Sequence, residues 1–239
     1  MKLQKYKHNS ETSYALGATL VAELLNTSPQ LITRIFVRPI NKRGTDLEKI
    51  IQQASAKHIE VIESSKAFNI LSAKENCLLI AEFRKPHTTL ESDTPHIVLV
   101  NPSDSGNLGT IIRSAIAFDY HNLAIITPSV DPYDPKVIRA SMGAVFHINI
   151  EQFASFDDYS AKYNRHNYAF MLNPSAQELT QCQRLTASYS LVFGNEAAGL
   201  PKDFCKKHGA AAIYIKQSPQ VDSLNLAIAA SIAMHHFSN

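Results

Sequence analysis

The fold of this chain is decided by the stretch Asn101-Pro-Ser-Asp-Ser-Gly-Asn-Leu-Gly-Thr-Ile-Ile-Arg113. It follows the apolar run Ile97-Val-Leu-Val100, which is typical of a strand covered on both faces in a parallel sheet. Apolar residues then recur at helical spacing over 108–118, so the polar stretch marks a strand-to-helix junction. Open α/β sheets bind their ligands at such junctions, beyond the carboxyl ends of the strands.

Two more polar stretches interrupt apolar patterns later in the chain: Gly194-Asn-Glu-Ala-Ala-Gly-Leu-Pro201 and Asp222-Ser-Leu-Asn-Leu-Ala227. The first follows the apolar run 191–193, and the second opens the long apolar helical pattern 224–237. In a parallel sheet all three stretches would line one edge. The sequence therefore predicts a single ligand site assembled from segments that lie far apart in the chain.

The pattern of the chain divides into two α/β parts. Helix and strand patterns alternate over 1–84, which predicts a small α/β domain. Residues 85–95 are polar, contain two prolines and lack periodicity, as expected of a linker. The alternation resumes over 96–239 with the apolar strands of a parallel sheet, so a second α/β domain is predicted there.

Composition is that of an ordinary globular protein, with 45% hydrophobic residues and a net charge of +2. This charge neither requires nor excludes a nucleic-acid partner. No apolar run reaches about 18 residues and no signal core follows the basic start, so we expect a cytoplasmic protein without a membrane span. Three scattered cysteines and histidines without ligand spacing predict neither a disulfide framework nor a metal site.

Each polar stretch carries a residue suited to a ligand, and each also has a plainer structural explanation. Arg113 can reach back over a glycine-rich loop that favours anions, but a tight turn with a solvated arginine explains the same residues. Glu196 either faces a ligand or caps a helix. Ser223 is suited to capping the terminal helix, which places Asn225 in the first turn, where its side chain can face a ligand.

Together these stretches resemble the three sequence motifs of the SpoU/TrmH family of RNA ribose 2′-O-methyltransferases, in the SPOUT superfamily. The family motifs run Asn/Asp-Pro-x-Asn-x-Gly-x-x-x-Arg, Gly-x-Glu-x-x-Gly-Leu, and Ser-Leu-Asn followed by a helix of small residues. They correspond here to 101–113, 194–200 and 223–230. The segment 135–146, with its Arg-Ala-Ser-Met-Gly, is similar to a further family segment, and the resemblance covers roughly 96–237.

The resemblance implies a SPOUT catalytic domain over 96–239, a mostly parallel α/β sheet that ends in a deep trefoil knot. Residues 1–84 then correspond to a small α/β RNA substrate-binding domain. S-adenosylmethionine is implied as the methyl donor, without a metal, and the chain is expected to form a homodimer. The implied substrate is structured RNA, either rRNA or tRNA, with rRNA favoured. DNA is not expected as a substrate, because it lacks the 2′-hydroxyl.

The resemblance also implies roles for individual residues. The expected catalytic residues are Arg113, Glu196, Ser223 and Asn225, with Arg113 stabilising negative charge on the ribose oxygen. The residues expected to bind the cofactor are Phe193, Gly194, Asn195, Gly199, Ile215, Leu224 and Asn225. The residues expected to bind the substrate are Asp104, Arg113 and Arg139.

One departure from the family pattern keeps other functions open. Asp104 stands where the first motif has asparagine, which replaces an amide donor by a negative charge. A relative that binds RNA or cofactor without catalysis is therefore one alternative. A base methyltransferase of the same superfamily is another, although Ser-Leu-Asn together with Arg113 argues against it. A Rossmann-type enzyme is a third, but the glycine fingerprint and the acidic residue about 20 positions further on are missing.

Overall fold

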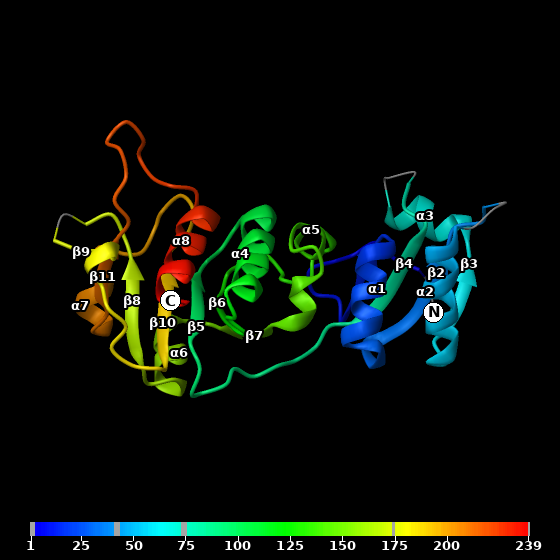
Figure 1. Ribbon diagram of the computed structural model, residues 1–239, viewed down its shortest axis with the longest axis horizontal. Helices are drawn as coiled ribbons and strands as arrows, with labels where there is room; N and C mark the ends of the chain where they lie inside the picture. The colour runs from blue at the N-terminus through cyan, green and yellow to red at the C-terminus, as the bar shows by residue number, and fades with distance from the viewer. Residues whose placement is uncertain (1–2, 41–43, 73–75, 174, 239) are drawn as a thin grey trace. The chain divides into compact units, whose positions relative to one another are not determined.

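The structure, a computed structural model, describes residues 3–40, 44–72, 76–173 and 175–238. The chain forms two compact units (Figure 1). Unit 1 comprises Met1–Pro86 and Asp131–His147, and unit 2 comprises His87–Val130 and Ile148–Asn239. The boundary thus falls inside the expected linker, and a stretch of the expected second domain packs into unit 1.

Unit 1 is built on a four-stranded mixed sheet of order β1-β4-β2-β3. Its strands are β1 (Thr12–Leu16), β2 (Ile32–Val37), β3 (Val61–Glu63) and β4 (Leu79–Arg84). Its helices are α1 (Ala18–Thr27), α2 (Thr45–Ala56), α3 (Ser65–Leu71) and α5 (Pro135–Ala140), with short 3₁₀ turns at Pro29–Leu31 and Ala144–His147. The helical stripe expected near the start of the chain is confirmed, because α1 buries Leu20, Val21, Leu24 and Leu25.

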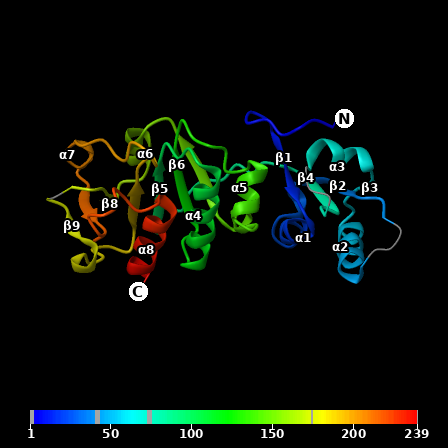
Figure 2. The same ribbon diagram turned by 90° about the horizontal axis from the view of Figure 1, so that it is seen from above.

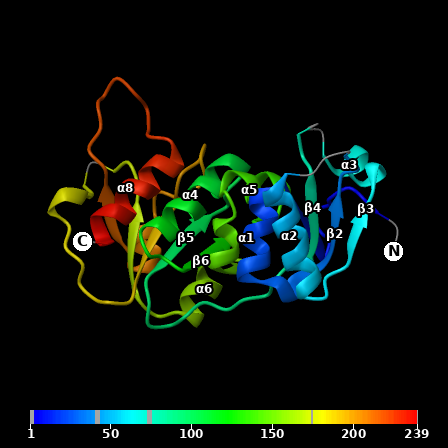
Figure 3. The same ribbon diagram turned by 45° about the vertical axis from the view of Figure 1, so that its right-hand side comes forward.

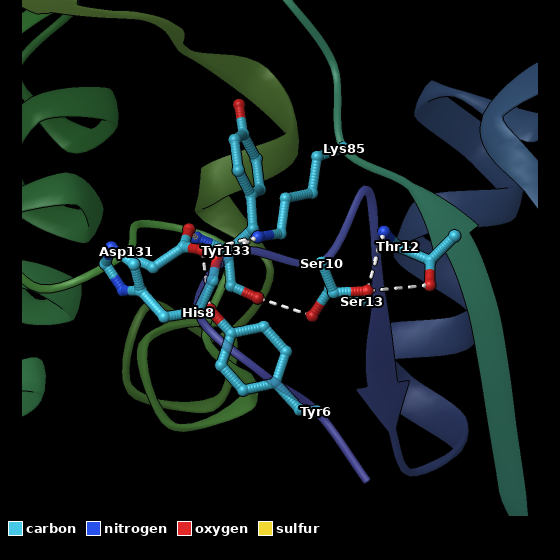
Figure 4. Close-up of polar contacts among 8 residues, drawn as sticks. All are labelled: Tyr6, His8, Ser10, Thr12, Ser13, Lys85, Asp131 and Tyr133. Carbon is cyan, nitrogen blue, oxygen red and sulfur yellow. Dashed lines mark hydrogen bonds and ion pairs between the residues drawn. The ribbon is translucent and has the colours of Figure 1, made fainter. Parts of the chain in front are cut away.

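A buried cluster around Asp131 holds the second stretch of unit 1 in place (Figure 4). The Asp131 carboxylate accepts hydrogen bonds from the Tyr6 hydroxyl, the Lys85 ammonium and the Tyr133 amide. The Ser13 hydroxyl, from β1, donates to the carbonyl of Tyr133. A buried carboxylate is tolerated only when it is paired. The cluster therefore ties together three segments of unit 1 that lie far apart in the sequence.

Unit 2 contains a seven-stranded sheet of order β7-β6-β5-β10-β8-β11-β9, in which every neighbouring pair is parallel. The strands are β5 (His96–Val100), β6 (Asn122–Ile126), β7 (Asn149–Phe153), β8 (His166–Phe170), β9 (Gln177–Glu178), β10 (Tyr189–Phe193) and β11 (Ala211–Tyr214). The predicted α/β class with a mostly parallel sheet is confirmed. The apolar strands are buried, as in sheets that are covered on both faces.

Helices cover both faces of this sheet, as Figure 2 shows, with α4 and α8 on one face and α6 on the other. The helices of unit 2 are α4 (Ser105–Ala117), α6 (Phe156–Lys162), α7 (Phe204–His208) and α8 (Leu226–Ser238), with a 3₁₀ turn at Leu179–Gln181. Helices α4 and α8 pack side by side, and the Ser231 hydroxyl of α8 donates to the Ser114 hydroxyl of α4 at 2.8 Å. This packing brings the start of α8 close to the start of α4.

Residues 87–95 form an ordered strap on unit 2 rather than a free linker. The Thr88 hydroxyl donates to the carbonyl of Ile150 at 2.9 Å and accepts from the Ile150 amide at 2.8 Å. Leu90 is buried in the core of unit 2. The Arg165 guanidinium donates to two carbonyls of the strap. The missing periodicity correctly marked irregular backbone, but burial and hydrogen bonds hold that backbone in place.

Candidate active site

The three polar stretches meet at the carboxyl end of the parallel sheet. Strands β5 and β10 are neighbours in the sheet (Figure 1), so the chain leaves both at the same edge, after Val100 and Phe193. The third stretch ends a long loop between β11 and α8, which Figure 3 shows extending from the sheet. Parallel topology thus assembles in space what the sequence separates.

Glu196 fixes the loop after β5 to the loop after β10. Its carboxylate accepts from the Ser103 amide at 3.0 Å, the Ser103 hydroxyl at 2.8 Å and the Asp104 amide at 3.1 Å. Partial burial acts to raise the pKa of Glu196, but these hydrogen bonds outweigh it and lower the pKa below the ordinary value. Glu196 is therefore an ionised acceptor that orders the first loop, not a proton donor.

Asn107 connects all three stretches. Its side-chain nitrogen donates to the Glu196 carboxylate at 3.4 Å. Its side-chain oxygen accepts from the side-chain nitrogen of Asn225 at 2.9 Å. The Asn225 side-chain oxygen in turn accepts from the amides of Ala227 at 2.9 Å and Ile228 at 3.3 Å. A side chain from each motif therefore takes part in one hydrogen-bonded chain.

Asn107 was not among the site residues predicted from the sequence, although the motif contained the signal. The family pattern places glycine four residues before its arginine and asparagine two residues before that glycine. Counted back from Arg113, these positions are Gly109 and Asn107. At this spacing the family asparagine corresponds to Asn107 and not to Asp104, so the departure that favoured a non-catalytic relative is not needed.

Asp104 instead caps helix α4. Its carboxylate accepts from the Asn107 amide at 2.7 Å, which is the contact of an N-cap. No ion pair joins Asp104 to Arg113 in the part of the chain that the structure describes. The carboxylate of Asp104 thus satisfies one of the orphan amides at the start of the helix, where a negative charge is favourable.

The terminal helix begins at Leu226, two residues later than the sequence pattern predicts. The cap is Asn225 and not Ser223, because the Asn225 side chain reaches the amides of Ala227 and Ile228. Ser223 is too far from these amides in the chain, and it is exposed at the rim of a cavity. Asn225 therefore has two roles, as a cap and as a contact to the first motif.

A cavity of about 480 Å³ opens beside this junction, within the size range of small-molecule sites. It is lined by six of the seven residues expected to bind the cofactor, Phe193, Gly194, Asn195, Gly199, Ile215 and Leu224, and also by Glu196 and Ser223. Asn225 is not among the lining residues. Part of the wall is aromatic, because the rings of Phe170 and Phe193 stack with centroids 4.6 Å apart.

Glycine is required in the loop that borders this cavity. A Cβ atom on Gly194 would lie 2.1 Å from the carbonyl carbon of Gly199 and 2.3 Å from the nitrogen of Leu200. Gly199 has a φ of +67°, in the left-handed region that favours glycine, and its amide donates to the Asn195 carbonyl at 2.9 Å. Close backbone contact therefore requires glycine at Gly194, whereas the left-handed φ favours glycine at Gly199.

Two predicted residues lie outside this group. Arg113 is exposed on α4, does not line the cavity, and has no hydrogen bond or ion pair with any described residue. It follows Asn107 by six positions, so the two side chains do not share a helix face. Arg139 is exposed on α5 in unit 1. Within the described residues no cluster could hold a metal ion, and no helix is long and apolar enough to cross a membrane.

Comparison with known proteins agrees with this architecture and motif set. A model of the SpoU rRNA Methylase family matches residues 94–235, and the chain belongs to this family. It is 29% identical to the Bacillus subtilis 23S rRNA (guanosine(2553)-2′-O)-methyltransferase RlmP, over 98% of this chain and 92% of that protein. It is 28% identical to a tRNA (cytidine(34)-2′-O)-methyltransferase candidate of the same organism, over 59% of this chain and 89% of that protein.

Solved structures show the same fold. The AdoMet-bound rRNA methyltransferase from Sinorhizobium meliloti superposes with a TM-score of 0.80 at 25% identity, covering 95% of this chain and 86% of that one. The SpoU methyltransferase AviRb from Streptomyces viridochromogenes, in complex with AdoMet, gives 0.78 at 18% identity, covering 95% and 89%. The likeness extends over both units, because each match covers nearly the whole chain.

Proposed function

We propose that this protein transfers a methyl group from S-adenosylmethionine to a ribose 2′-hydroxyl of ribosomal RNA. One observation carries the proposal: Asn107, Glu196 and Asn225, one from each motif, are joined by hydrogen bonds beside a cavity of about 480 Å³. Membership in the SpoU rRNA methylase family and the full-length similarity to a 23S rRNA 2′-O-methyltransferase support ribosomal RNA as the substrate.

The cavity suits the proposed cofactor in its volume of about 480 Å³ and in the chemistry of its wall. The apolar surface of Phe170, Phe193 and Ile213 suits an adenine ring. Gly194 and Gly199 also line the cavity, so the closely packed backbone of this loop forms part of its wall. When bound, S-adenosylmethionine supplies an electrophilic methyl group on a sulfonium sulfur.

Arg113 is proposed to stabilise the nucleophile. A ribose hydroxyl is a very weak acid, so the charge that develops on its oxygen needs a fixed positive partner. A guanidinium is permanently charged and does not readily act as a base. Its exposed side chain, without a partner among the described residues, leaves this charge available to RNA.

A homodimer is proposed to complete the site, because Arg113 does not line the cavity of its own chain. Helix α8 starts at the site and carries two exposed isoleucines one helical turn apart. Ile228 is 50% exposed and Ile232 is 39% exposed. Exposed apolar residues on one helix face support a subunit contact there. In this arrangement the Arg113 of one protomer serves the cavity of its partner.

The remaining roles also belong to the proposal. Unit 1, with the exposed Arg139, is proposed to bind the RNA substrate, and the segment that follows β10 is proposed to be threaded as the SPOUT trefoil knot. Asp104 contributes through the cap of α4 rather than through RNA. Ser223, at the rim of the cavity, is proposed to contact the substrate. A ribosomal RNA substrate implies a cytoplasmic location.

The test combines a cellular map with a purified reaction. Sites of 2′-O-methylation are mapped across rRNA and tRNA in cells with and without the gene, and one rRNA site should disappear. On RNA containing that site, Arg113→Ala should lower transfer about 100-fold and leave the affinity for S-adenosylmethionine, measured by calorimetry, unchanged. Lys206→Met, an exposed α7 variant, is the control. An unchanged methylation map contradicts the proposed substrate, and unchanged transfer by Arg113→Ala contradicts its role.

A further inference from the structure

Three of the six polar side chains that line the cavity are already engaged in holding the loops. Glu196 is occupied by the amides and hydroxyl of the first stretch. The Asn195 amide nitrogen donates to the Asn101 carbonyl at 2.8 Å, and its oxygen accepts from the amides of the turn that follows it. These groups build the cavity, so their hydrogen-bonding capacity is used within the protein.

Gln217 is engaged in the same way at the base of the long loop. Its side-chain oxygen accepts from the Leu224 amide at 3.1 Å, and its nitrogen donates to the Asp222 carbonyl at 3.3 Å. Gln217 thus pins the two ends of this loop together. It also fixes the backbone of Asp222 and Leu224, two residues that line the cavity.

Two charged side chains at the cavity remain unused. Lys202 follows the glycine loop and Asp222 opens the third stretch, and both line the cavity and are exposed. Neither side chain has a hydrogen bond or an ion pair among the described residues, and no ion pair joins one to the other. The rim therefore presents one free positive and one free negative charge.

The rest of the wall is unsuited to charged groups. It is formed largely by apolar side chains such as Phe170, Phe193 and Ile213, of which the last two are buried. A charge placed against such a wall loses its hydration without gaining a partner, which is costly. A ligand with charged groups must therefore direct those groups to the rim.

We infer that Lys202 binds the α-carboxylate and Asp222 the α-ammonium of the methionine part of S-adenosylmethionine. The pair matches a zwitterionic α-amino acid, with one charge of each sign for each group. This inference rests on the proposed function, since it assumes the cofactor in this cavity. The two residues act as positioning residues, because they hold the end of the cofactor that does not react.

Calorimetric titration with three ligands separates the two contacts. S-adenosylmethionine carries both charged groups, its decarboxylated form keeps only the ammonium, and 5′-deoxy-5′-dimethylsulfonioadenosine keeps the sulfonium but neither group. The variants are Lys202→Met and Asp222→Asn, with Lys206→Met as the control for loss of an exposed positive charge on α7. All three substituted side chains are exposed, so the folded state should be retained.

The expected pattern differs between the variants. Lys202→Met should weaken S-adenosylmethionine binding about threefold to tenfold and leave the affinity for both other ligands unchanged. Asp222→Asn should weaken S-adenosylmethionine and its decarboxylated form by similar factors, but not the ligand that lacks both groups. Lys202→Arg should retain most of the affinity, because it keeps the positive charge.

Other outcomes would overturn the inference. If Lys202→Met binds S-adenosylmethionine normally but raises the KM for RNA, Lys202 contacts RNA phosphate instead. If either variant weakens all three ligands equally, its effect does not depend on the amino-acid end of the cofactor. Failure of the unsubstituted protein to bind S-adenosylmethionine would contradict the proposed function itself, and is thereby distinguished from failure of this inference.

Discussion

The side chain of Asn225 donates a hydrogen bond to the side chain of Asn107 at 2.9 Å, across 118 positions of sequence. The same carboxamide accepts from the Ala227 amide and so starts helix α8. Because one group performs both tasks, the start of the last helix and the first motif have a fixed mutual geometry. The site is thus assembled by the capping of a helix as well as by the edge of the sheet.

Substitution of Asn225 should separate its two roles. Asn225→Asp keeps an oxygen for the cap but loses the donor to Asn107, so stability should change by less than about 1 kcal/mol. Asn225→Ala loses both contacts and should cost about 2 kcal/mol. Both variants should lower methyl transfer at least tenfold. Chemical denaturation and transfer assays on the same preparations check this, and equal stability of the two variants would contradict the cap.

Glu196 should make the protein sensitive to acid. Its folded-state pKa lies below the ordinary value, so ionised Glu196 contributes stability above pH 4.5 that is lost as the pH falls through the folded pKa. Glu196→Gln should therefore lower the free energy of unfolding by about 1 kcal/mol at neutral pH. The reason is that glutamine replaces one accepting oxygen by an NH₂ group, which cannot accept from the backbone amides of Ser103 and Asp104. The difference between the two proteins should shrink toward pH 3.

Denaturation at a series of pH values measures this difference directly. Groups other than Glu196 titrate in both proteins, so their contributions cancel in the comparison. A difference that stays constant from pH 7 to pH 3 would show that Glu196 is not held ionised by the first loop.

Three glycines should respond to alanine in a graded order. At Gly44 the φ is negative and an added Cβ would have no atom within 4 Å, so Gly44→Ala should be neutral or slightly stabilising. Gly199→Ala has space but a φ of +67°, and should cost about 1–2 kcal/mol. Gly194→Ala meets backbone at 2.1 Å and should cost about 3 kcal/mol or prevent folding. Thermal unfolding of the set checks the order.

The Asp131 cluster should be a strongly coupled unit. Lys85→Met leaves a buried carboxylate with one partner fewer and should cost about 3 kcal/mol, as should Asp131→Asn. The double variant should be less destabilised than the sum of the single variants, because neither charge is then left alone. A double-mutant cycle in urea measures the coupling. If the effects of the two single variants on the free energy of unfolding simply add, the contact between Lys85 and Asp131 does not itself stabilise the protein.

The periodicity of the sequence predicted the secondary structure of unit 2 well, because those signals are local. The run 97–100 is buried strand β5, and the stripe at Leu108, Ile111 and Ile112 is the buried face of α4. Parallel strands place their carboxyl ends together whatever the details of packing. For that reason the convergence of the three stretches followed from the pattern alone.

Membership of a unit could not be predicted in the same way. Helix α5 buries Val137 and Ile138, but the sequence contains no signal for which core receives them. The Asp131 cluster places this segment in unit 1, because Asp131 contacts Tyr6 and Lys85, which are remote in the chain. The strap 87–95 is similar, since its order comes from partners such as Ile150 and not from its own composition.

The motif residues and their order along the chain, and with them the groups available for chemistry, followed from the amino-acid pattern alone. Which polar groups at the site are used within the protein, and which remain free, depends on how the chain folds in three dimensions. The side chains of Glu196 and Asn107 have their partners on other loops, whereas the side chains of Lys202 and Asp222, next to the motifs, have none among the described residues. This difference arises because hydrogen bonds depend on distances in space, and folding brings together segments that lie far apart in the chain.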